Sequence, residues 1–80
     1  MRWTIYRERN TDNNITIRYS YEDDDSCDGV IVYDRKAEEF SIIKLSSSAD
    51  KFVTEWLCGL LYGVLNDDSY TEKKRVICVG

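Results

Sequence analysis

The chain has 80 residues, a formal net charge of −4 and a hydrophobic fraction of 42%. A chain of this length forms one domain that buries only about 60 to 65% of the surface exposed on unfolding, so we expect modest stability. It contains no histidine, which excludes Ser-His and Cys-His nucleophiles and removes the commonest transition-metal ligand.

The cysteines Cys27, Cys58 and Cys78 lie far apart and form no CxxC pair. This spacing is typical of neither a zinc site nor a disulfide framework, so reduced thiols are expected. We expect Cys58 and Cys78 at the edges of the core and Cys27 in a reachable polar loop. The four glycines are too dispersed for a phosphate-binding loop, and the sequence predicts no cofactor.

The first residues alternate polar and apolar side chains instead of forming the apolar segment of a secretory signal. A cytoplasmic location without membrane association is therefore expected. Residues 3–7 and 15–21 are separated by a dense turn signal at residues 10–14, which predicts a β-hairpin. Four side chains share the expected buried face of the second strand: Ile15, Ile17, Tyr19 and Tyr21.

Residues 22–28 are strongly acidic, and we expect a loop because like charges neither pack nor pair across strands. Its acids are Glu22, Asp23, Asp24, Asp25 and Asp28. Asp24, Ser26 and Asp28 match the first ligand positions of an EF-hand loop. The match then fails, since Arg35 stands where a bidentate Glu is needed. No specific metal site is predicted, and the loop is instead a candidate partner-binding segment for a basic surface.

Residues 30–33 are apolar at every position, and residues 40–45 are mostly apolar. This pattern predicts two strands that are buried on both faces. One helix covers only one face, so we expect an apolar back face that is available to a second copy or to another protein. The residues assigned to this surface are Ile31, Tyr33, Ile43 and Leu45.

Residues 50–65, DKFVTEWLCGLLYGVL, form the one run long and apolar enough to be a helix that carries a core. On a 3.6-residue period its apolar stripe is wide, and Thr54 falls on the opposite side. The helix is predicted to pack on the sheet through Phe52, Trp56, Leu60 and Val64. Gly59 and Gly63 predict close approach to the sheet, because each costs about 1 kcal/mol relative to Ala within a helix.

These elements, with a final strand at residues 75–79, predict an α+β domain of order ββββαβ, an antiparallel meander of four strands with one helix on its face. Two edges are open to the last strand. Beside the first strand the order is 5-1-2-3-4, whereas beside the fourth strand the link is a right-handed crossover. The sequence leaves this choice open.

The sequence favours a small non-enzymatic protein-interaction module that uses the apolar sheet face and the acidic loop, with a homodimer as one form. An alternative, by analogy of size and charge, is a phage or mobile-element inhibitor that mimics nucleic acid and blocks a basic cleft, as some anti-CRISPR proteins do. A second alternative is an enzyme that uses carboxylates and Cys27. Direct nucleic-acid binding is not expected, because the chain as a whole is acidic.

Overall fold

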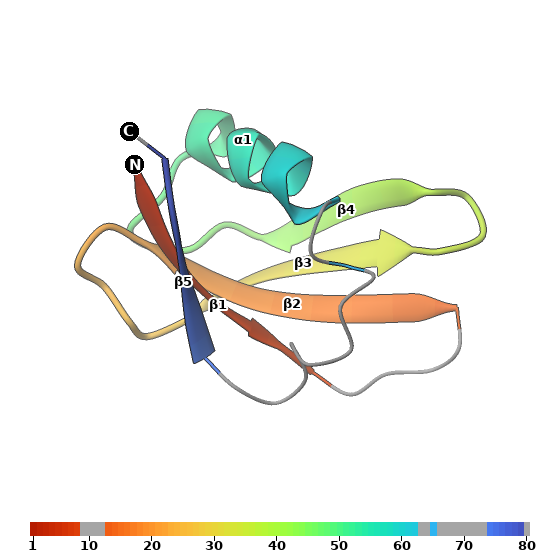
Figure 1. The fold of residues 1–80 in the computed structure, drawn as a ribbon, viewed down its shortest axis with the longest axis horizontal. Helices are drawn as coiled ribbons and strands as arrows, with labels where there is room; N and C mark the ends of the chain where they lie inside the picture. Colours follow the sequence, from red (N-terminus) through yellow and green to blue (C-terminus); the bar gives the residue numbers. More distant parts are fainter. Residues whose placement is uncertain (9–12, 63–64, 66–73, 80) are drawn as a thin grey trace.

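The computed structural model describes residues 1–8, 13–62, 65 and 74–79. The chain order is the expected ββββαβ (Figure 1). The elements are β1 (Arg2–Arg7), β2 (Asn14–Tyr21), β3 (Gly29–Asp34), β4 (Glu39–Lys44), α1 (Lys51–Leu61) and β5 (Lys74–Cys78). No helix in these described ranges is long and apolar enough to cross a membrane.

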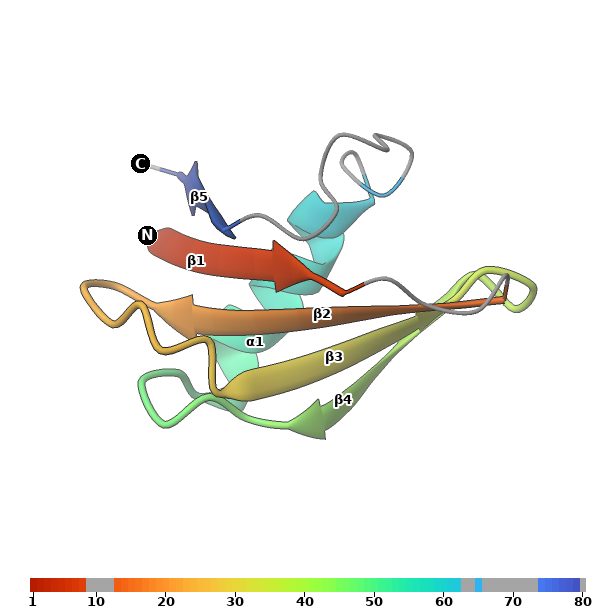
Figure 2. The ribbon, with the colours of Figure 1, turned by 90° about the horizontal axis from the view of Figure 1, so that it is seen from below.

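The strands form one five-stranded antiparallel sheet in the order β4-β3-β2-β1-β5. The last strand therefore pairs with β1, the first of the two positions that the sequence left open. Figure 2 shows α1 along one face of this sheet, with β5 at the edge next to β1. The chain ends are joined there, since the Met1 amino group donates to the Val79 carbonyl (2.7 Å) and the Val79 N–H donates to the Met1 carbonyl (2.8 Å).

The register decides which strand residues lie under the helix, because cross-strand partners point to the same face. Ile17 pairs with Ile31, and Tyr33 pairs with both Ile15 and Phe40. Ile31 is completely buried in the core. The expectation that Ile31 and Tyr33 lie on an open back face is therefore wrong: both belong to the face that α1 covers.

The opposite face of the sheet is mixed in character. Val30 lies opposite Arg18, and Val32 lies opposite Thr16. β4 is an edge strand with several exposed side chains, among them Ile43, which is 63% exposed next to a register shift in the β3–β4 pairing. The expectation that residues 40–45 are buried on both faces is therefore also wrong, because an edge strand with a helix on one side has little to cover its other surfaces.

Asp50 caps the start of α1, and its side chain accepts a hydrogen bond from the backbone N–H of Val53 (2.9 Å). A carboxylate in this position satisfies one of the unpaired N–H groups of the first turn and lies at the positive end of the helix dipole. The helix buries one side, made of Val53, Thr54, Leu57, Cys58 and Leu61.

This buried side is rotated from the expected one. Phe52 is 62% exposed and Trp56 is 46% exposed, so the prediction that they pack on the sheet is wrong. Leu60 is partly buried against the core, as expected, and Val64 and Gly63 lie outside the described residues. Gly59 is exposed with open space where a Cβ would stand, which contradicts the expected close approach.

Thr54 explains the rotation. Its hydroxyl is buried, contrary to expectation, and is satisfied by the Tyr19 hydroxyl (2.7 Å) and the Asp50 carbonyl (2.8 Å). Tyr19 also accepts from the backbone N–H of Ser46 (3.1 Å). Burial of a hydroxyl is costly unless it is hydrogen-bonded, so these partners allow a polar residue to occupy the centre of the buried side.

Candidate interaction surface

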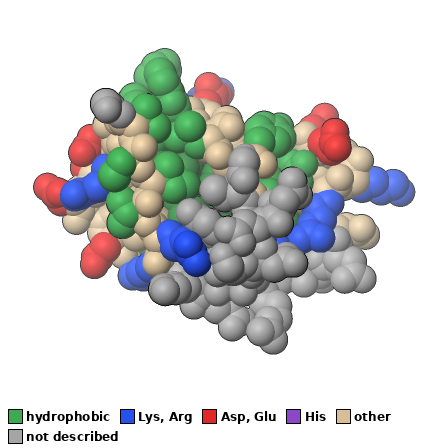
Figure 3. Space-filling view, viewed as in Figure 1, with side chains coloured by type: hydrophobic (Ala, Val, Ile, Leu, Met, Phe, Trp, Pro, Cys, Tyr) green, Lys and Arg blue, Asp and Glu red, His purple; other side chains and the backbone are tan. Residues whose placement is uncertain are grey.

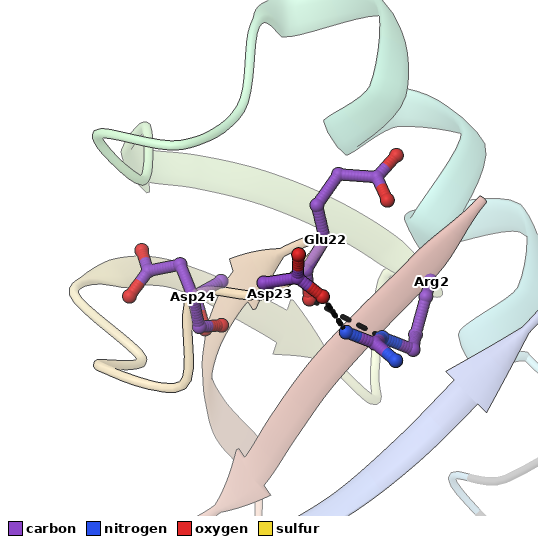
Figure 4. A network of polar contacts seen from close by, with 5 residues as sticks. Arg2, Glu22, Asp23 and Asp24 are labelled. Carbon is purple, nitrogen blue, oxygen red and sulfur yellow. Dashed lines mark hydrogen bonds and ion pairs between the residues drawn. The ribbon is translucent and has the colours of Figure 1, made fainter.

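The acidic loop, residues 22–28, is bonded to the rest of the molecule at its first residues. Arg2 on β1 donates from Nε to the Glu22 carbonyl (3.3 Å) and forms an ion pair with the Asp23 carboxylate (Figure 4). The Asp23 side chain is 97% exposed, so this pair adds little to stability. Asp24 lies apart from this contact, and its Oδ1 accepts from the Ser26 N–H (2.9 Å), which holds the pKa of Asp24 below its usual value.

Asp28, at the other end of the acidic loop, joins it to the segment that precedes α1. Its Oδ1 accepts from the Ser46 hydroxyl (2.5 Å), and the Ser47 N–H donates to both carboxylate oxygens (3.3 and 3.2 Å). These bonds favour the ionised form and hold the pKa of Asp28 well below its usual range. Asp28 is therefore a connection between two loops.

The middle of the acidic loop folds over the back of the sheet. The Ser20 hydroxyl donates to the Asp24 carbonyl (2.5 Å), and the Cys27 thiol donates to the Thr4 carbonyl (3.7 Å). Lys74 on β5 donates to the Asp25 carbonyl (2.8 Å). Contacts with β1, β2 and β5 show that the acidic loop covers one end of the back face.

The thiols differ from the expected arrangement. Cys27 is buried, whereas Cys78 is exposed, and no described cysteine forms a disulfide. Burial raises the pKa of the Cys27 thiol, and it raises the pKa of Cys58 to about 11. Both changes disfavour the nucleophilic thiolate. In addition, the described residues contain no group of three or more metal-ligating side chains.

The largest exposed aromatic side chains lie on α1. Phe52 and Trp56 are one turn apart, and their rings meet edge to face with centroids 5.9 Å apart. Figure 3 shows hydrophobic side chains gathered over the first half of the helix. We define the α1 outer face as the helix residues that are exposed: Lys51, Phe52, Glu55, Trp56 and Gly59.

Other exposed apolar side chains have different surroundings. Tyr62 is half exposed but packs edge to face on Phe40 and Tyr33, with centroids 4.8 and 5.9 Å apart. Ile43 and Leu45, at the end of β4 and just beyond it, are 63% and 41% exposed. They are the two members of the expected apolar surface that remain open, and the structure does not bring them together with Ile31 and Tyr33 on one face.

The α1 outer face was missed from sequence because aromatic residues within an apolar stripe are usually core. One signal points to it. The stripe contains more apolar positions than one buried side of a helix can hold, so some of them must face away from the sheet. No family model, curated protein or solved structure matches the chain.

Proposed function

We propose that this protein is a non-enzymatic protein-interaction module that binds its partner through the α1 outer face. The observation that carries the proposal is the exposure of Phe52 and Trp56 side by side on one helix. Aromatic side chains are enriched at the centres of protein interfaces, where they supply much of the binding energy. In this domain they stand on a rigid helix, so they lose little conformational freedom on binding.

The two rings alone would support only weak binding. An aromatic side chain offers about 150 to 250 Å² of surface, so roughly 100 Å² of each ring remains available to a partner. Burial of that area is worth about 2.5 kcal/mol per ring, or about 5 kcal/mol for both. Association itself costs at least about 4 kcal/mol, so the two rings need contacts from their polar neighbours to produce a stable complex.

Two other hypotheses have less support. Cys27 as a nucleophile is disfavoured by its burial and its raised pKa. A nucleic-acid mimic needs free negative charge, whereas the Asp28 carboxylate of the acidic loop is hydrogen-bonded to Ser46 and Ser47. The nucleic-acid mimic therefore stays a prediction from the sequence. In it, the other acidic side chains of the loop would contact a basic partner.

Site-specific photo-crosslinking tests the proposed surface. A benzophenone amino acid is placed at position 52 or 56, and at position 76 as a control, because Val76 is also exposed (57%) but lies on β5. After illumination in cells that express the protein, mass spectrometry identifies the adducts. We expect discrete protein adducts from positions 52 and 56 but not from position 76. Identical adduct patterns from all three positions would contradict the proposal.

A further inference from the structure

We propose that the partner on the α1 outer face is a second copy of this chain, bound with the two α1 helices antiparallel. This inference rests on the proposed function, because it assigns an occupant to the same surface. It is carried by the charge pattern of that surface and by the spacing of its two rings.

The charge pattern of the α1 outer face is self-complementary. The chain has a net charge of −4, so two copies repel each other over most approaches. The α1 outer face instead carries one cation and one anion, Lys51 and Glu55, one turn apart with Nζ and Oε1 at 3.9 Å. In a two-fold contact, a residue that meets a second residue is met in return by its counterpart. An antiparallel pair thus sets Lys51 of each copy beside Glu55 of the other.

The same arrangement pairs the aromatic rings. In an antiparallel pair, contact between Lys51 and Glu55 and contact between Phe52 and Trp56 require registers that differ by two residues, or about 3 Å along the helix axis. These long side chains can bridge that difference, so Phe52 of each copy lies near Trp56 of the other. Gly59, further along this face, has no side chain and open space around it, so it leaves room for the segment that precedes α1 in the second copy. Four rings contribute about 400 Å². Stable interfaces need about 1,200 Å², so flanking side chains must supply the rest and the dimer will dissociate on dilution.

Charge reversal provides the test, with sedimentation velocity over a concentration series as the readout. We expect the unaltered protein to show a monomer–dimer equilibrium. Lys51→Glu and Glu55→Lys each place like charges together at both ends of the contact and should weaken dimerisation about tenfold. A mixture of the two variants should form a heterodimer, and the double variant should recover self-association.

The mixture separates contact between copies from effects within one helix. Lys51→Glu lowers the net charge of −4 by two and Glu55→Lys raises it by two, so both chains remain negative and general attraction cannot join them. Ile43→Ser is the control at another surface. Ile43 is as exposed as Phe52 (63% and 62%) but lies on β4, so this variant should leave the dimer unchanged. Circular dichroism and melting curves verify that every variant is folded.

Three results would overturn the inference. They are a monomer at every concentration, no heterodimer in the mixture, and a dimer that Ile43→Ser dissociates while the charge variants do not. If crosslinks at positions 52 and 56 then join a different protein, the proposed function stands and only the identity of the partner is wrong. If those positions form no specific adduct and the chain is monomeric, both proposals fail.

Discussion

Single polar side chains set the geometry around α1. The Tyr19 hydroxyl contacts Thr54 on the helix and Ser46 in the segment before it, so one strand residue fixes both the rotation of the helix and the path of the chain that leads to it. Asp28 acts on the same segment from the acidic loop, through Ser46 and Ser47. A hydrophobic pattern alone would not fix this geometry, because apolar contacts have little directional preference.

The depressed pKa of Asp28 makes its contribution to stability depend on pH. A carboxyl group whose folded-state pKa lies below its unfolded value of about 3.9 stabilises the fold above that value, and the contribution is lost as pH falls through the folded-state pKa. We expect Asp28→Asn to be less stable than the unaltered protein at pH 7, and the difference to shrink below about pH 4. Urea unfolding across this pH range measures both quantities.

Asp25→Asn is the matched control for Asp28→Asn, because it removes the same charge from the same acidic loop at an exposed position. It should change stability much less at pH 7. If the two variants show the same loss of stability at every pH, the effect of Asp28 is general charge repulsion in the loop and not its hydrogen bonds to Ser46 and Ser47.

At the scale of elements, the rotation of α1 predicts which of two neighbouring residues supports the fold. Leu57 is completely buried, whereas Trp56 is 46% exposed. Leu57→Ala should cost about 2 to 5 kcal/mol, since it leaves a cavity in the core. Trp56→Ala should cost less than Leu57→Ala, because nearly half of the Trp56 side chain already lies in solvent and its removal leaves no enclosed cavity. Chemical denaturation of the two variants under conditions that favour the monomer measures the difference.

A large loss of stability in Trp56→Ala with little change in Leu57→Ala would mean that the helix buries the other side. The comparison is made at low protein concentration. A dimer through the α1 outer face would itself stabilise the folded protein, and loss of that dimer in Trp56→Ala would be read as a contribution of Trp56 to the fold.

The elements differ in how far the sequence determines them. The strands and their order along the chain could be predicted, because a period of two and the turn residues between strands are local signals. The buried side of α1 could not, since Phe52 and Trp56 are as apolar as Leu57 and Leu61, and the choice depends on the hydroxyl pairing of Thr54 with a distant strand. The position of β5 likewise depends on pairing with β1, which no local pattern specifies.

The candidate site was only partly predictable for the same reason. The excess of apolar surface was visible in the sequence, but its location was not. Residues 30–33 are apolar at every position, so their pattern does not indicate which alternate pair faces the helix; the register places Ile31 and Tyr33 opposite core residues. The acidic loop was correctly placed between two strands, whereas its bonds to Arg2 and Ser46 depend on contacts far apart in the chain.

At the scale of the whole molecule, the three thiols report on different layers. Cys58 lies on the buried side of α1, Cys27 belongs to the acidic loop and packs on the opposite side of the sheet, and Cys78 is exposed on β5. Each layer therefore contains one cysteine, and the rate at which that cysteine reacts with a thiol reagent reports how well the layer excludes solvent.

We expect Cys78 to react with a thiol reagent much faster than the other two in the native protein. Burial keeps the reagent away from Cys27 and Cys58 and so slows their reaction. In addition, the pKa of about 11 leaves Cys58 with roughly a hundredfold less thiolate than an ordinary thiol at neutral pH. Variants that keep one cysteine each, with Ser at the other positions, give the three rates separately, and denatured samples of the same variants provide the unprotected rates. If Cys27 reacted as fast as Cys78, the acidic loop would not be folded onto the sheet in solution. Its carboxylates would then be free for a basic partner, which would favour the acidic loop over the α1 outer face as the binding surface.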